Sequence, residues 1–167
     1  VGSIARTAKN MDIDAIFIVR GEPLVEEDMK QMSTHFAADL VEKIRYFDTL
    51  KDALSGFEYI VGTTARKGHA RGPLISPREA AERVTDISQM NRVALLFGPE
   101  DTGLSNEDLR YCHAAVTIPT SPKMKSINLS HAVMILCYEI FVARMPAAEK
   151  FVPRLAQSAE LEGMYEQ

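Results

Sequence analysis

The segment 96–105 carries the residues with the clearest chemical potential in this sequence. It leaves an apolar run, places Gly98 and Gly103 on either side of Glu100 and a second acid, and then reaches a typical helix start. The glycine spacing mimics a phosphate-binding loop, but Leu104 stands where that loop needs a lysine. Two adjacent carboxylates would also repel a phosphate. The segment therefore predicts a ligand-binding turn whose ligand is neutral or cationic at this point.

Apolar runs of strand length alternate with helical patterns along the chain. We expect strands at 15–19, 59–61, 93–97 and 115–118. We expect helices at 4–11, 29–44 and 49–54, then from Ser76 onward, from Ser105 or Asn106 to Tyr111, and at 128–144. The strands are apolar throughout, which is typical of a parallel sheet covered on both faces. The sequence thus predicts an α/β domain with a mostly parallel sheet and helices on both faces.

Ligands of such sheets bind beyond the carboxyl ends of the strands. Unusual residues follow three of the predicted strands, in the segments 62–66, 98–100 and 118–120. We expect these three loops to line one pocket.

The charge distribution is more informative than its sum. The 167-residue chain has a formal net charge of −4, which argues weakly against a broad nucleic-acid footprint. One acid-free stretch nevertheless holds four cationic side chains, those of Arg66, Lys67, Arg71 and Arg78. This stretch is either a local basic patch or a solvated loop.

Cysteine and histidine usage excludes several classes of site. Two cysteines are too few for a disulfide framework, so we expect Cys112 and Cys137 to be reduced, in a cytoplasmic protein. The four histidines show no metal-ligand spacing, so we expect no metal. No apolar run approaches the roughly 20 residues of a membrane span, so we expect no membrane partner.

Three segments together resemble the SPOUT superfamily of RNA methyltransferases, in its TrmH-type branch. The first is 1–11, in which Ala5-Arg6 and Lys9-Asn10 match the first motif of that branch. The second is the turn at 96–105, and the third joins 118–120 to the run Ser126-Ile127-Asn128-Leu129-Ser130-His131-Ala132. The run Thr63-Thr64-Ala65-Arg66 and the tail 155–167 resemble the TrmJ-like subgroup. The motifs follow one another at the separations of the family, over nearly the whole chain.

The resemblance implies a fold that the patterns alone would not suggest. SPOUT proteins have a deep C-terminal trefoil knot, an exception to the rule against knotted chains. The knot shapes a site for S-adenosylmethionine, which leaves as S-adenosylhomocysteine, and the family works as homodimers with the active site at the subunit junction. Against the family pattern, the motif-one asparagine and a first strand are missing in front of Val1, and the TrmJ-like extension is cut short. We therefore expect a SPOUT domain at 1–146 and the start of an extension or linker at 147–167.

The resemblance also assigns roles to residues. The catalytic candidates are Arg6, Glu100, Ser126 and Asn128. We expect Arg6 to bind the adjacent phosphate and stabilise developing alkoxide charge, because guanidinium does not readily deprotonate. Glu100 is expected to position Asn128 or Arg6, or to help accept the proton. Asn128 is also a candidate cap for the last helix.

The remaining assignments concern binding. The cofactor candidates are Thr63, Thr64, Ala65, Gly98, Glu100, Ile118, Ser126, Ile127 and Leu129. The candidates for contacts with substrate RNA are Arg66, Lys9 and Arg71. The long apolar helix at 128–144 is expected to cover the sheet with one face and to pack on a partner subunit with the rest. A helix buried entirely within its own domain is the alternative.

The resemblance implies an S-adenosylmethionine-dependent RNA ribose 2′-O-methyltransferase that acts on tRNA, at the first nucleotide of the anticodon loop. A ribosomal RNA target is the alternative within the fold. A non-catalytic knotted RNA-binding module is the alternative from another class, and a flavodoxin-like small-molecule binder is a third.

Overall fold

A four-stranded parallel sheet forms the centre of the molecule. The computed structural model describes residues 2–19, 21, 44–65, 73–124 and 126–146. The strands of the central sheet run in the order β4-β6-β3-β5, and every neighbouring pair is parallel. Their bounds are Tyr59–Thr63 (β3), Leu74–Ile75 (β4), Val93–Leu96 (β5) and Ala114–Val116 (β6). The predicted α/β architecture with a parallel sheet is confirmed.

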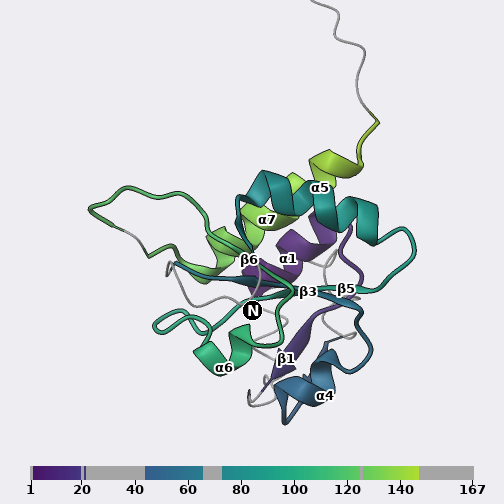
Figure 1. The fold of residues 1–167 in the computed structure, drawn as a ribbon, viewed down its shortest axis with the longest axis horizontal. Helices are drawn as coiled ribbons and strands as arrows, with labels where there is room; N and C mark the ends of the chain where they lie inside the picture. The colour runs from purple at the N-terminus through teal and green to yellow at the C-terminus, as the bar shows by residue number, and fades with distance from the viewer. Residues whose placement is uncertain (1, 20, 22–43, 66–72, 125, 147–167) are drawn as a thin grey trace, which may run out of the picture.

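Helices cover both faces of this sheet (Figure 1). One face carries α1 (Gly2–Asn10), α5 (Pro77–Ile87) and α7 (Leu129–Arg144). The other face carries α4 (Leu50–Leu54) and α6 (Asn106–Leu109). Neighbouring residues of β3 pack on opposite faces of the sheet, because successive side chains of a strand point in opposite directions. Val61 packs with α5 and α7, whereas Ile60 packs with α4 and α6.

A second sheet, of two strands, completes the described structure. β1 (Phe17–Val19) pairs in parallel with β2 (Arg45–Phe47) in a separate two-stranded sheet. Neither β2 nor β4 was predicted, and Ile44, the expected end of a helix, lies outside any helix. The rest of that predicted helix, 29–43, lies outside the described residues.

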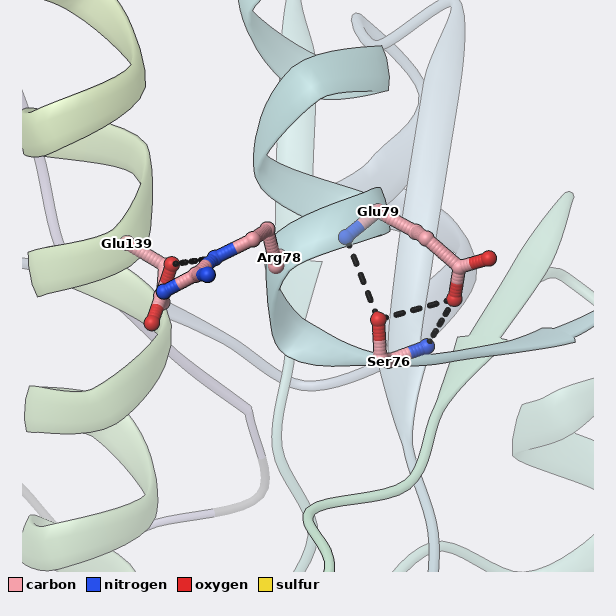
Figure 2. A network of polar contacts seen from close by, with 4 residues as sticks. All are labelled: Ser76, Arg78, Glu79 and Glu139. Atoms are coloured by element: carbon pink, nitrogen blue, oxygen red, sulfur yellow. Dashed lines mark hydrogen bonds and ion pairs between the residues drawn. The ribbon is translucent and has the colours of Figure 1, made fainter.

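Side-chain caps fix where the helices near the site begin. Ser76 caps α5 in a capping box with Glu79, and Pro77 follows at the first helical position, as predicted (Figure 2). Ser105 caps α6 in the same way with Asp108. Asn128 caps α7 by accepting from the backbone N–H of Ser130. All three helices therefore start at residues that the sequence marks.

The last helix, α7, buries one face and exposes another. Leu136 and Ile140 are buried against the sheet and α5, and Val133 is buried as well. Tyr138 and Val142 remain exposed by 52% and 42%, on the side away from this core. Within the described ranges, no helix has the length and apolar character needed to cross a membrane. The helix thus has the two apolar faces that the sequence analysis expected.

Candidate functional site

The carboxyl ends of β5, β3 and β6 lie side by side and are joined by hydrogen bonds. The hydroxyl of Thr63 donates to the carbonyl of Leu96 at 3.2 Å. On the other side, the N–H of Thr64 donates to the carbonyl of Val116 at 2.9 Å, and the hydroxyl of Thr117 donates to the carbonyl of Thr64 at 2.9 Å. The three loops that we expected to meet therefore begin at one edge of the sheet. Their starting positions are held by hydrogen bonds between neighbouring strand ends, two of them from threonine hydroxyls, which makes this edge a rigid base for a site.

The turn after β5 folds back on itself, and both of its glycines are required by geometry. A side chain at Gly98 would collide with the backbone of Gly103 and Leu104. Gly103 has φ +67°, a conformation that favours glycine, and its N–H donates to the carbonyl of Pro99 at 2.8 Å. Leu104 is buried and packs in the core beneath β3. The position that would carry lysine in a phosphate loop thus points into the protein.

The turn meets the start of α7 through a direct contact. The Nδ2 group of Asn128 donates to Oε1 of Glu100 at 2.5 Å, across 28 positions of sequence. Oδ1 of the same amide accepts from the backbone N–H of Ser130 at 2.9 Å and from its hydroxyl at 2.6 Å. Of the two partners expected for Glu100, the structure shows Asn128. The three residues form one polar cluster, which we call the Glu100–Asn128–Ser130 cluster.

The other candidates on this side of the sheet vary in exposure. Thr63, Thr64, Gly98, Ile118, Ile127 and Leu129 are half-buried. Ala65 and Ser126 are exposed. The segment between β6 and α7, which carries Ile118, runs out from the body of the protein and returns to the start of α7 (Figure 1). Half-exposed apolar side chains and exposed polar ones therefore lie along the segments that leave this edge.

The basic candidates have mixed outcomes. Arg6 and Lys9 are exposed on α1, which packs against α7. Within the described part of the chain, Arg6 has no hydrogen-bond or ion-pair partner, so no contact to Glu100 is present. The other two RNA candidates, Arg66 and Arg71, lie outside the described residues.

Arg78, from the basic stretch, forms an ion pair within the protein. It reaches from α5 to Glu139 on α7, where its Nε lies 3.3 Å from Oε2 (Figure 2). The side chain of Arg78 remains 77% exposed, so the pair is screened by water. Its charge is shared with a carboxylate and contributes less to a basic patch than the sequence suggests.

A surface hollow lies elsewhere, between α4 and α6. It has a volume of about 370 Å³ and is lined by Thr49, Leu50, Lys51, Glu107, Asp108, Arg110 and Tyr111. None of these residues was a candidate, and the hollow includes no member of the Glu100–Asn128–Ser130 cluster. Among the described residues, no group of three or more His, Cys, Asp or Glu side chains could hold a metal ion.

Two polar residues at the site were not singled out from the sequence, Ser130 and Thr117. The signal for Ser130 is an Asn-x-Ser spacing at a helix start, which places the serine N–H and hydroxyl over the asparagine side chain. The signal for Thr117 is weaker, because its partner, the carbonyl of Thr64, is 53 positions away.

Comparison with known proteins identifies the family of this fold. Residues 1–138 match the model of the SpoU rRNA Methylase family. The chain belongs to this family. The match covers the turn, the strand ends and the start of α7, so the whole Glu100–Asn128–Ser130 cluster lies within it.

Individual relatives agree with the family. The chain is 38% identical over 154 residues to the tRNA (cytidine/uridine-2′-O-)-methyltransferase TrmJ of Yersinia pestis (strain Pestoides F), covering 92% of this chain and 59% of that protein. It is 31% identical to a probable methylase family protein of Haemophilus influenzae Rd KW20, with a TM-score of 0.79 over 99% of this chain and 70% of the other. TrmJ from Z. mobilis ZM4 gives 28% identity and a TM-score of 0.76, with the same coverage of 99% and 70%. The chain spans about three fifths of the length of the curated relative.

Proposed function

We propose that this chain is the methyltransferase domain of an S-adenosylmethionine-dependent RNA ribose 2′-O-methyltransferase that acts on tRNA, in the anticodon loop. Family membership supports methyl transfer, and the curated relative is named as a tRNA 2′-O-methyltransferase. The observation that carries the proposal is the Glu100–Asn128 contact, because it places an ionisable acceptor and an amide donor together at the carboxyl edge of the sheet. The two side chains come from distant segments and are both exposed. Asn128 also caps α7, but the cap bond uses its Oδ1 and leaves its Nδ2 group for Glu100.

The groups along this edge suit a sulfonium donor with an adenine ring. When bound, S-adenosylmethionine would supply an electrophilic methyl group attached to a positively charged sulfur. The exposed carboxylate of Glu100 favours a nearby cation. Half-buried Ile118, Ile127 and Leu129 offer apolar surface. The hydroxyl oxygen of Thr63, which donates its proton to Leu96, can still accept a hydrogen bond, and Thr64 follows it at the same edge. These residues, with Ala65, Gly98 and Ser126, are the ones we assign to the cofactor.

The hydrogen bonds already formed within the cluster determine which of its atoms remain available to a ligand. Oδ1 of Asn128 already accepts two hydrogen bonds, and one of the two N–H groups of its amide is hydrogen-bonded to Glu100. The amide therefore acts on a substrate only as a donor, through its remaining proton. The Glu100 carboxylate keeps its second oxygen, which makes it the acceptor available for the proton of a ribose hydroxyl. Ser126, exposed two residues earlier, contributes a further hydroxyl to the ligand.

Arg6 completes the catalytic set in this proposal. Its guanidinium keeps its charge and is exposed on α1, so it can bind a substrate phosphate and stabilise charge that develops on the ribose oxygen. Lys9 lies on the same helix, and Arg66 and Arg71 follow β3; we assign all three to the RNA. An Arg6→Ala variant should lower kcat more than it weakens S-adenosylmethionine binding.

The same proposal includes the finer features that the family resemblance implies. These are the C-terminal trefoil knot, a homodimer that uses the exposed face of α7, and a cytoplasmic location. They also include the division into a SPOUT domain at 1–146 and the beginning of an extension or linker at 147–167. The exposed apolar side chains of Met134, Tyr138 and Val142 support the dimer, because a stripe of this kind favours a partner surface.

The test combines binding with product mapping. Calorimetry with S-adenosylmethionine and S-adenosylhomocysteine should show binding by the dimeric protein, and ribose-methylation mapping should place the product in the anticodon loop of tRNA. A Glu100→Gln variant tests the proposed proton acceptor, because it keeps the size of the side chain and removes its charge. It should retain RNA binding and lose roughly 10²-fold or more in kcat, in the range of general base catalysis.

Each alternative predicts a different result. Methylation found only in ribosomal RNA would move the substrate and keep the reaction. RNA binding without any affinity for either cofactor form, in a dimeric preparation, would point to the non-catalytic module and refute the enzyme.

A further inference from the structure

Ser130 makes two contacts with one oxygen, and only one of them is needed to cap the helix. The backbone N–H of Ser130 gives the cap bond to Oδ1 of Asn128 at 2.9 Å. The hydroxyl of Ser130 gives a second bond to the same oxygen at 2.6 Å. A hydroxyl of this kind is dispensable for the helix, because the cap bond remains when it is removed.

The second bond has a consequence for the other end of the amide. With both lone-pair directions of Oδ1 filled, the amide plane of Asn128 is held on one side, and its Nδ2 group is aimed at Glu100. A donor on the carbonyl oxygen also polarises the amide, so its N–H becomes a better donor to the carboxylate. The hydroxyl thereby acts on Glu100 through an intervening side chain.

We propose that Ser130 is a positioning residue of the site, whose hydroxyl fixes the orientation of the Asn128 amide and through it the carboxylate of Glu100. This inference rests on the proposed function for its catalytic consequence, since it deepens the roles given to Glu100 and Asn128. The structural part does not depend on the reaction. Ser130 is half-buried beside the two exposed side chains, so it holds them from the protein side and leaves their outer edges to a ligand.

Three variants separate positioning from folding. Ser130→Ala removes the hydroxyl and keeps the backbone bond, and Ser130→Thr keeps both. Ser88→Ala is the control, because it removes a hydroxyl that donates to the carbonyl of Thr85 at the end of α5, away from the cluster.

The kinetic readout is a split between kcat and KM in the full chain. Ser130→Ala should lower kcat by about 3- to 10-fold, the effect of one lost hydrogen bond, with KM for S-adenosylmethionine and for tRNA changed by less than about twofold. Ser130→Thr should restore kcat to within about twofold of the parent, and Ser88→Ala should leave it unchanged. A kcat for Ser130→Ala equal to that of Ser88→Ala would overturn the catalytic part of the proposal.

A spectroscopic readout decides the structural part without any activity. In ¹⁵N-labelled protein the two Nδ2 protons of Asn128, assigned with Asn128→Asp, should be well separated because one of them faces a carboxylate. In Ser130→Ala they should move together, and in Ser130→Thr they should stay apart. If the parent protein methylates no RNA, the proposed function fails while this spectrum still tests Ser130. Unchanged Asn128 resonances in Ser130→Ala, or failure of threonine to restore them, would overturn the positioning role.

Discussion

The most informative single perturbation is Gly98→Ala, because the structure predicts its cost from sterics alone. A Cβ at residue 98 would lie 2.6 Å from the carbonyl oxygen of Gly103 and closer still to the backbone carbon of Gly103 and the nitrogen of Leu104. All three are backbone atoms, so no flexible side chain can move aside. The turn must open, and the bond from the Gly103 N–H to the carbonyl of Pro99 must lengthen or break.

The magnitude follows from these two effects. Overpacking a closely packed site costs about 1–3 kcal/mol. A lost backbone hydrogen bond adds about 0.5–1.5 kcal/mol. We therefore expect Gly98→Ala to lower the free energy of unfolding by about 2–4 kcal/mol, which for a chain of this size lowers the Tm by roughly 10 °C.

Gly103→Ala is the matched control within the same turn. A Cβ at Gly103 meets nothing within 4 Å, but the residue has φ +67°. Its cost is therefore conformational, about 1–2 kcal/mol. Urea unfolding of both variants checks the order, with Gly98→Ala the less stable. A loss below about 0.5 kcal/mol for Gly98→Ala, or the reverse order, would refute the steric argument.

Three further predictions concern residues outside the turn. Hydrogen bonds from Ser76, first from its backbone N–H and then from its hydroxyl, hold the pKa of Glu79 below its ordinary value of 4.5. The resulting stabilisation is fully present above pH 4.5 and is lost as the pH falls through the lowered pKa of the folded state. The stability gap between Glu79→Gln and the parent should therefore close in acid urea titrations and must not widen. Burial raises the pKa of the Cys112 and Cys137 thiols to about 11 each. Mass spectrometry at pH 8 should therefore show slow labelling of both thiols by iodoacetamide in the native protein and fast labelling in urea. Equal labelling rates in the two conditions would contradict the burial of the thiols. His113→Phe keeps an aromatic ring but removes the Nδ1 atom that accepts from the backbone N–H of Ile60 on β3. Chemical denaturation should show a free energy of unfolding lower by about 1–3 kcal/mol. A stability equal to that of the parent would mean that this hydrogen bond contributes little.

Local signals in the sequence were sufficient for most of the fold. Capping boxes and apolar strands depend on neighbouring residues, so Ser76, Ser105 and three of the four central strands, β3, β5 and β6, were predicted. β2 and β4 could not be predicted in this way. β2 contains Arg45 and an exposed tyrosine, and its extended form comes from pairing with β1 and from the contact of its Phe47 ring with Phe17 at 5.0 Å. β4 has two residues, and its pairing with β6 defines it.

The family motif and the turn chemistry named individual residues of the candidate site, and their catalytic and binding roles stay predictions. Both glycines of the turn are required by its geometry, whereas the close approach to a ligand that we expected of them stays a prediction. Glu100 contacts Asn128, one of its two expected partners. The contribution of Ser130 depends on a hydroxyl orientation that only the folded start of α7 defines. The pairing of Arg78 with Glu139 depends on how α5 packs on α7, and no local pattern contains that information.

The cluster spans separate segments, so activity should depend on the turn more steeply than stability does. Glu100 sits on the turn that Gly98 closes, while its partner Asn128 is fixed at the start of α7. If Gly98→Ala opens the turn, the carboxylate moves away from an amide that stays in place. A misplacement of about 1 Å can cost about 10²-fold in rate, while a loss of about 2–4 kcal/mol leaves a protein of ordinary stability mostly folded. Gly98→Ala assayed at low temperature should therefore lose far more kcat than its folded fraction by circular dichroism explains, and Gly103→Ala should lose less. If kcat falls only in proportion to the folded fraction, the carboxylate and amide do not act as a geometric unit, and the role proposed for their contact must be given up.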